Sequence, residues 1–276
     1  MKIFAHRGLV FEYPENTLVS FEESLKRGFG LELDIHRTKD DKIVIMHDSN
    51  TKRLTGYNYY IPETDWQILK ELDCGSHFNK KFSDQKIPLL TEVFDLFRKY
   101  NPKNQEIAVQ LKDNTEKNIV NLISELLLNY NKKHPKFKLF RKIFIFDTTV
   151  SNAKKLKKWC PELRVSLSIG ETKNFPDKRH PTIYTYDEVK EETCWDMVWA
   201  DEWEEGLYSK EFVNVVHNDN KSIQIISPEL HIETNPKHPL SEKGYENLWK
   251  RIITWHADGI CTNYPDKFKR ILEKIR

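Results

Sequence analysis

The stretch that decides the fold is KIFAHRGLVFEYPENTLVSFEESLKRGFGLELDI, residues 2–35. Residues 2–6 and 31–35 are apolar segments of strand length, and residues 15–27 between them repeat apolar side chains at helical spacing. A strand, a helix and a second strand in this order are typical of a parallel sheet. The turn after the first strand contains one glycine, whereas an open doubly wound sheet usually has a glycine-rich phosphate loop there. The stretch therefore favours a closed barrel.

The same alternation of strand and helix continues to the end of the chain. Further strands are predicted at residues 43–47, 106–112, 142–146, 164–169, 196–200, 222–226 and 258–262. Helices are predicted at residues 90–100 (with Thr91 as the N-cap), 114–130, 149–158, 185–193, 209–219, 241–254 and 265–275. Roughly eight strand–helix units indicate an α/β protein, a (β/α)8 TIM barrel. We expect one domain over residues 1–276.

One segment interrupts the alternation. Residues 48–86, after the second strand, look irregular and polar and are too long for an ordinary barrel loop. We expect a small inserted cap at the barrel mouth. Two interpretations stay open: a lid that selects the alcohol part of a substrate, or a purely structural cover.

Composition restricts the partners and the compartment. The formal net charge is +2, so nothing in the charge balance requires a nucleic-acid partner. No run is long and apolar enough to span a bilayer, so we expect no stable membrane insertion. The opening MKIFAHRG lacks the apolar run of a secretory signal. The four cysteines are scattered without a CxxC pair, which is typical of free thiols in a reducing cytoplasm.

Polar side chains gather where the early strands end. The residues concerned are His6, Arg7, Glu32, Asp34, His47, Asp48, Gln110 and Lys112. Alternate residues of a strand point to the same side, so the two carboxylates of the second strand share one face. Because the active residues of a barrel lie at the carboxyl ends of its strands, we expect all of these side chains at one mouth.

This combination suits phosphodiester cleavage. Two carboxylates on one face repel each other unless a cation or water lies between them. Glu32, Asp34 and the side-chain carbonyl of Gln110 offer the oxygen ligands that a hard divalent cation prefers. Such a cation, together with Arg7, would neutralise the phosphate charge that builds in the transition state.

Two histidines supply the proton transfers that this chemistry needs. His6 and His47 each follow a strand, and the reference pKa of histidine lies near neutrality. One would protonate the leaving oxygen, and the other would activate the attacking water or hydroxyl. The pattern does not say which histidine is the acid.

The chain also resembles a known family in several segments. They are HRG at 6–8, PENT at 14–17, ELD at 32–34, TKRLTG at 51–56, IPLLTEVF at 87–94 and DGICTNYPDKF at 258–268. Together they resemble the glycerophosphodiester phosphodiesterase family, within the phospholipase C-like barrel superfamily. The resemblance implies a TIM barrel and one cation, Ca²⁺ or Mg²⁺. It also implies hydrolysis of small glycerophosphodiesters to sn-glycerol 3-phosphate and an alcohol.

The resemblance assigns roles residue by residue. It implies that His6 and His47 are the acid–base pair and that Glu32 and Asp34 bind the metal. It implies that the phosphate is held by Arg7 and Lys112.

The chain departs from the family at two places. Gln110 stands where the family usually has a glutamate ligand, so we expect weaker cation binding. In IISPELH, residues 225–231, where the family often has a tryptophan segment, Glu229 is a candidate to supply the missing charge.

Two alternative functions stay open. One is a phospholipase D-like lyase that acts on a lysophospholipid or sphingolipid and releases a cyclic phosphate. The other is a non-catalytic barrel that binds phosphate ligands.

Overall fold

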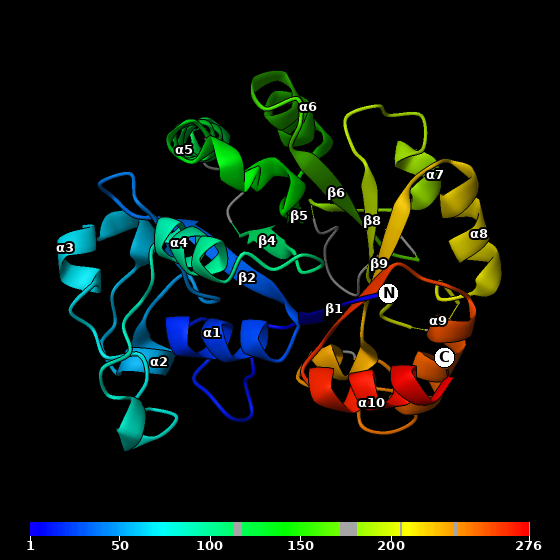
Figure 1. Ribbon diagram of the computed structural model, residues 1–276, viewed down its shortest axis with the longest axis horizontal. Helices are drawn as coiled ribbons and strands as arrows, with labels where there is room; N and C mark the ends of the chain where they lie inside the picture. Colours follow the sequence, from blue (N-terminus) through cyan, green and yellow to red (C-terminus); the bar gives the residue numbers. More distant parts are fainter. Residues whose placement is uncertain (113–117, 172–180, 205, 235–236, 276) are drawn as a thin grey trace. The chain divides into compact units, whose positions relative to one another are not determined.

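The computed structural model describes residues 1–112, 118–171, 181–204, 206–234 and 237–275. The chain forms two compact units (Figure 1). The N-terminal unit is Ala5–Ile143, and the C-terminal unit comprises Met1–Phe4 with Phe144–Arg276. The prediction of one domain with an inserted cap stays a prediction.

Eight of the strands alternate with helices in the order of a (β/α)8 barrel, counted within the described part of the chain. These strands are β1 (Lys2–Ala5), β2 (Gly30–Arg37), β4 (Ile107–Leu111), β5 (Ile143–Phe146), β6 (Arg164–Ile169), β8 (Met197–Ala200), β9 (Ser222–Ile226) and β10 (Gly259–Thr262). The helices between and after them are α1 (Leu18–Lys26), α4 (Leu90–Tyr100), α5 (Ile119–Lys133), α6 (Val150–Trp159), α7 (Tyr186–Val189), α8 (Lys210–Asn218), α9 (Tyr245–Thr254) and α10 (Pro265–Ile275). The fold class is the predicted one.

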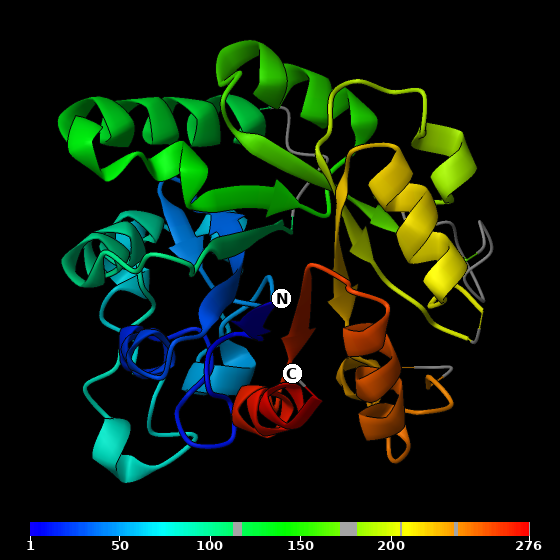
Figure 2. The same cartoon turned by 45° about the vertical axis from the view of Figure 1, so that its right-hand side comes forward.

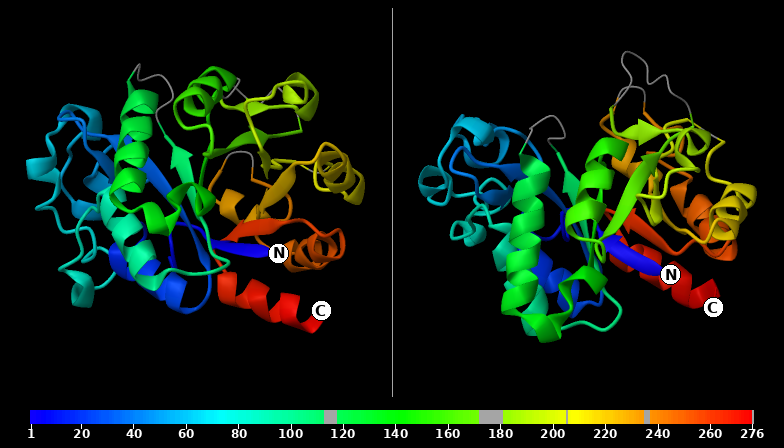
Figure 3. Two further views of the ribbon diagram at one scale, coloured as in Figure 1. Left: turned by 45° about the horizontal axis from the view of Figure 1, so that its top comes forward. Right: turned by 90° about the horizontal axis from the view of Figure 1, so that it is seen from above.

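One predicted strand has a different place. β3 (Ile43–Ile45) pairs with β2 in the antiparallel sense, while β4 pairs with β2 in parallel. Figure 3 shows β2 beside β4 from two further sides. Ile43–Ile45 therefore form a short return strand on β2, because only a few residues separate the two and a parallel crossover needs a dozen or more.

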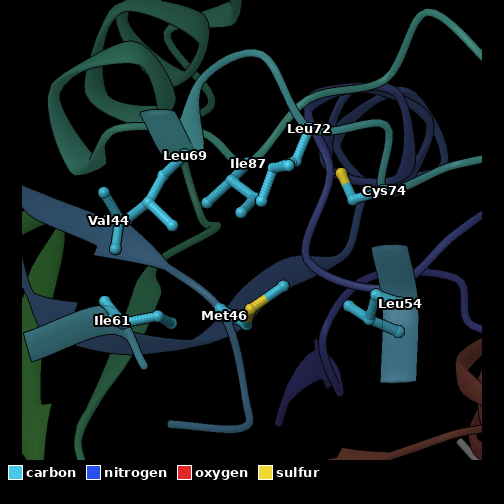
Figure 4. Packing of buried hydrophobic residues seen from close by; sticks show 8 residues of the cluster. All are labelled: Val44, Met46, Leu54, Ile61, Leu69, Leu72, Cys74 and Ile87. Carbon is cyan, nitrogen blue, oxygen red and sulfur yellow. The ribbon is translucent and has the colours of Figure 1, made fainter. Parts of the chain in front are cut away.

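Residues 48–86, called the inserted segment below, contain more helical turns than the sequence suggests. Short helices form at α2 (Lys52–Thr55), η1 (Ile61–Glu63), α3 (Trp66–Leu69) and η2 (Lys80–Phe82). A hydrophobic cluster lies between them and β3 (Figure 4): Val44, Met46, Leu54, Ile61, Leu69, Leu72, Cys74 and Ile87. Each large apolar side chain buried there contributes roughly 1.5–3 kcal/mol. Most of residues 48–86 lies outside helices and strands, as predicted, but the apolar residues within it pack together although they show no clear period.

Helix α4 has the predicted bounds but another cap. Leu89 precedes the helix as its N-cap, and its backbone N–H donates to the carboxylate of Glu92 at 2.7 Å. Thr91 lies inside the first turn. A carboxylate in the first turn satisfies an amide that has no partner within the helix.

The C-terminal unit carries a parallel sheet and an aromatic core. β5, β6, β8, β9 and β10 pair in parallel, and the two-residue strand β7 (Ile183–Tyr184) pairs in parallel with the end of β6. Trp199 of β8 stacks on Phe146 at 4.1 Å between ring centroids and contacts Phe4 at 6.0 Å. α9 and α10 lie side by side (Figure 2), with Trp249 against Phe268. Among the described helices, none combines the length and the apolar character needed to cross a membrane.

Candidate functional site

The predicted site residues other than Glu229 all belong to the N-terminal unit, where the pairing of β2 with β4 brings several of them together. In that register Asp34 is opposite Gln110. The backbone N–H of Lys112 then bonds to the carbonyl of Ile35 at 3.4 Å. The carboxyl ends of these two strands therefore place a carboxylate, an amide and an amine next to one another, as the sequence predicted.

The backbone conformation of the turn after β1 directs an N–H group toward the carboxylate of Glu32. Arg7 and Gly8 both adopt left-handed conformations, with φ of 53° and 90°. The Arg7 N–H then donates to Oε2 of Glu32 at 3.0 Å. A Cβ on Gly8 would lie 2.1 Å from Oγ of Ser20, so this position needs glycine for space as well as for its backbone angles. His6, beside this turn, has Nε2 at 4.0 Å from the same carboxylate oxygen.

The two carboxylates of β2 are buried and differ in ionisation. Glu32 and Asp34 are 2% and 1% exposed. Burial, and then the charge of Asp34, raise the pKa of Glu32 to about 8. Burial opposes ionisation of Asp34 too, but the charges of Lys112 and Arg7 outweigh it and hold its pKa below the usual range. The raised pKa of Glu32 favours its protonated form, and the lowered pKa of Asp34 favours its ionised form.

Asp34 is the centre of a polar network. Nζ of Lys112 lies 3.2 Å from its Oδ1, and Nε of Arg7 lies 3.5 Å from its Oδ2. The side-chain amide of Asn16 donates to Oδ2 at 2.9 Å. This contact joins the loop after β1 to β2. The φ of Asn16, 55°, is one that asparagine tolerates better than most residues.

His47 is held at its ring and at its backbone. Nδ1 lies 2.8 Å from Oδ1 of Asp48, and Nε2 of His36 lies 3.2 Å from the His47 carbonyl. Burial lowers the pKa of His47, although the charge of Asp34 acts in the opposite direction. Desolvation disfavours the charged imidazolium, so the ring stays neutral and able to accept a proton near pH 7.

Two charged residues of this region were not predicted. Arg53 donates to Glu15 with Nη1 and Nη2, each at 2.8 Å, and to Oδ2 of Asp48 with Nε at 2.7 Å. Glu15 also lies 3.4 Å from Nη1 of Arg7. The sequence signal was present, since Arg53 lies in the TKRLTG segment, but spacing alone does not show a partner 38 residues away.

The donor set suits a hard cation. Glu32, Asp34 and the amide of Gln110 offer oxygen atoms alone, which is what Ca²⁺ and Mg²⁺ prefer. Oδ1 of Asp34 accepts no hydrogen bond from any described residue and has only its ion pair with Lys112 there. No group of three or more His, Cys, Asp and Glu side chains in the described ranges is placed to hold a metal. Glu32, Asp34 and Gln110 include only two side chains of these types, so that result does not cover them, and cation binding stays a prediction.

Glu229 lies in the C-terminal unit and is already engaged there. It is 3% exposed and accepts hydrogen bonds from the hydroxyls of Ser227 and Thr262 and from the backbone of Asn263 at 3.2 Å. Burial raises its pKa. These contacts tie the end of β9 to the end of β10. Whether it replaces the missing ligand charge stays a prediction.

Comparison with known proteins identifies the family. The family model for glycerophosphoryl diester phosphodiesterases matches residues 6–267. A glycerophosphodiester phosphodiesterase of Bacillus altitudinis is 26% identical over 281 residues, covering 100% of this chain and 99% of the relative. A human lysophospholipase D is 37% identical over 142 residues, covering 48% of this chain and 43% of the relative.

A solved structure agrees in fold. The phosphodiesterase of Oleispira antarctica, in complex with the product sn-glycerol-3-phosphate, has a TM-score of 0.73 at 18% identity. The match covers 99% of this chain and 97% of that one. At this identity the likeness confirms the (β/α)8 fold, while the family model extends over most of the sequence. The chain therefore belongs to the glycerophosphoryl diester phosphodiesterase family and is an enzyme of that class, a phosphoric diester hydrolase.

Proposed function

We propose that the enzyme hydrolyses small glycerophosphodiesters to sn-glycerol 3-phosphate and an alcohol with the help of one divalent cation. The observation that carries the proposal is the buried pair Glu32 and Asp34 beside the cations Arg7 and Lys112. Carboxylates facing one another need a cation, and cations beside them suit a phosphate. One site can therefore hold both groups.

Glu32, Asp34 and Gln110 would hold the cation, which we propose is Ca²⁺ or Mg²⁺. When bound, the cation supplies positive charge to the phosphate oxygens. Arg7 and Lys112 orient the phosphate and stabilise the charge that it gains in the transition state. Binding of the cation would also favour loss of the proton from Glu32, because burial raises the pKa of this carboxyl to about 8.

His6 and His47 move the protons. His47 presents Nε2 to the substrate because its Nδ1 is held by Asp48. His6 lies next to Glu32 at the end of β1. One imidazole takes a proton from the attacking water while the other gives a proton to the leaving alkoxide.

A second candidate substrate is a lysophospholipid. Tyr57, Tyr59 and Tyr60 of the inserted segment are 61%, 36% and 47% exposed, and the first two rings stack at 6.4 Å. Their turn is hydrogen-bonded to Thr51, close in sequence to His47. Exposed aromatic side chains near a site suit an acyl chain or a lipid surface. In this case the segment acts as a lid that selects the substrate, and a cyclising reaction would release a cyclic phosphate.

We also propose a cytoplasmic location and no nucleic-acid partner. The four cysteines are all buried as free thiols, as expected in a reducing compartment. The near-balanced net charge supports the absence of a nucleic-acid partner.

The test is release of sn-glycerol 3-phosphate from glycerophosphocholine, glycerophosphoethanolamine and glycerophosphoinositol, with Ca²⁺, with Mg²⁺ and with EDTA. We expect release with metal, loss with EDTA, and loss in His6→Ala and His47→Ala. A parallel arm with lysophosphatidylcholine, analysed for linear and cyclic products, tests the second candidate. Activity that survives EDTA would exclude the cation, and inactivity on all three diesters with activity on the lysolipid would replace the first proposal by the second.

A further inference from the structure

A neutral histidine and four side chains of alternating charge connect the two histidine-bearing loops of the N-terminal unit. The order is His47, Asp48, Arg53, Glu15 and Arg7, and each contacts the next at 2.7–3.4 Å. This series of contacts, the contact chain, begins at the proposed acid–base histidine, His47, and ends at the proposed phosphate ligand, Arg7. The inference drawn from it rests on the proposed function.

Both oxygens of Asp48 are fixed by this contact chain. Oδ1 contacts Nδ1 of His47 at 2.8 Å and accepts from Nη2 of Arg53 at 3.2 Å, while Oδ2 accepts from Nε of Arg53 at 2.7 Å. Burial opposes ionisation, but the hydrogen bonds from Arg53 and His47 prevail and lower the pKa of Asp48 to about 2. An ionised carboxylate accepts and never donates, so Nδ1 of His47 carries the proton.

This proton position determines which nitrogen does the chemistry. With Nδ1–H bound to Asp48, the free lone pair of neutral His47 is on Nε2. The ring cannot turn about its χ2 bond without losing the contact. The backbone of His47 is held separately by His36 at 3.2 Å.

Arg53 fixes Asp48 in turn. Its guanidinium is planar, and it bonds Asp48 on one edge and Glu15 on another. Glu15 is 14% exposed at its side chain and also faces Arg7. Arg53 lies in α2 of the inserted segment, so the contact chain joins that segment to the β1–α1 loop.

We propose that Arg53 is a positioning residue for the hydrolysis, which orients His47 through Asp48 and does not bind the substrate itself. A direct contact with substrate phosphate would give a different result, because loss of Arg53 would then raise KM. A purely structural role, in which Arg53 only holds residues 48–86 in place, would give a third kinetic result. Its loss would then lower stability and leave the kinetics of the folded enzyme unchanged.

The experiment is a double-mutant cycle of Arg53→Met and Asp48→Asn, assayed on glycerophosphocholine with saturating metal. General acid–base catalysis contributes roughly 10²–10⁴-fold, so we expect Asp48→Asn to lower kcat roughly 100-fold. We expect Arg53→Met to lower kcat roughly 10- to 100-fold, with KM changed by less than about threefold. The double variant should be no slower than Asp48→Asn, because both act through one contact.

The pH profile gives a second readout. Removing the charge of Asp48 disfavours the imidazolium, so the limb governed by His47 should move to lower pH whether His47 is the acid or the base. The other charges that act on His47, Asp34, Lys112 and Arg7, are unchanged in this variant. Arg53→Lys keeps the charge but loses the fork, so it should recover only part of kcat.

Arg27→Met is the matched control. Arg27 forms an equivalent two-pronged pair with Glu12, at 2.6 and 2.7 Å, in the same unit. It should match the wild type in kcat and pH profile, and unfolding midpoints of all variants separate stability from kinetics. Multiplicative effects in the double variant, a raised KM in Arg53→Met, or kinetics equal to those of Arg27→Met would overturn the proposal. An inactive wild type, or an active His47→Ala, would instead reject the proposed function.

Discussion

Nζ of Lys112 lies 3.2 Å from Oδ1 of Asp34, so a proposed phosphate ligand and a proposed metal ligand form an ion pair with each other. Asp34 is nearly inaccessible to solvent, and the side chain of Lys112 is 18% exposed. A cation bound at Asp34 would therefore be repelled by the amine, and its affinity would be lower than the carboxylates alone would give.

Lys112→Met should separate cation binding from catalysis. Removing the amine removes this repulsion, so we expect Ca²⁺ to bind roughly tenfold more tightly, while kcat/KM falls because the phosphate loses a ligand. Titration calorimetry of the apo-protein and steady-state kinetics measure the two quantities. Lys26→Met, which removes an exposed ion pair with Glu23, is the control. Weaker Ca²⁺ binding in Lys112→Met would contradict the prediction.

Gln110→Glu should strengthen the metal site. A third carboxylate beside Asp34 adds a charged ligand, and the affinity of calcium sites rises with ligand charge. We expect roughly tenfold tighter Ca²⁺ binding, together with lower stability of the metal-free protein from repulsion among three acids. Calorimetry and thermal melts with and without Ca²⁺ test this. An unchanged affinity would show that residue 110 does not contact the cation.

The grouping of the proposed metal and phosphate ligands could be predicted from the sequence because it depends on local rules. Strand parity places Glu32 and Asp34 on one face, and parallel pairing places Gln110 beside Asp34. The antiparallel direction of β3 follows from the sequence too, because the few residues between β2 and β3 are too short for a parallel crossover. The contact between Arg53 and Glu15 could not be predicted, because it joins two loops and leaves no periodic pattern in the sequence.

The bounds of helices were predictable to differing degrees. α10 was predicted with its observed bounds, Pro265–Ile275, because proline opens it and its apolar spacing is regular. The predicted helix at residues 241–254 begins later, at Tyr245, after Gly244 with a φ of 94°. The predicted start of the helix at 114–130 lies outside the described residues. The helix is described as Ile119–Lys133.

Gly8→Ala should destabilise the fold by more than its backbone angle alone explains. Left-handed φ costs an L-residue roughly 1–2 kcal/mol, and a Cβ here would also strike Ser20, whose hydroxyl accepts from Leu9 at 2.8 Å. Gly28 is a matched control, since its φ of 89° is nearly the same and nothing lies within 4 Å of its Cβ position. We expect Gly28→Ala to cost about 1 kcal/mol and Gly8→Ala at least about 2 kcal/mol more in urea unfolding. Equal losses would show that Ser20 moves aside freely.

Glu229→Gln should stabilise the protein at neutral pH and not in acid. Burial raises the folded-state pKa of Glu229 above its usual 4.5, so between the two values the folded state holds a proton that the unfolded state has lost. The free energy of unfolding of the wild type therefore falls as pH rises through this window. Glutamine has no proton to lose and keeps an oxygen for Thr262 and Asn263.

The measurement is urea unfolding of wild type and Glu229→Gln from pH 4 to pH 8. The advantage of the variant should grow with pH above 4.5 and vanish below it, because the wild-type carboxyl is then protonated in both states. Glu71→Gln, at an exposed side chain, should show no such growth. A variant that is less stable than the wild type at every pH would mean that the ionised carboxylate, and not the protonated one, is what joins β9 to β10.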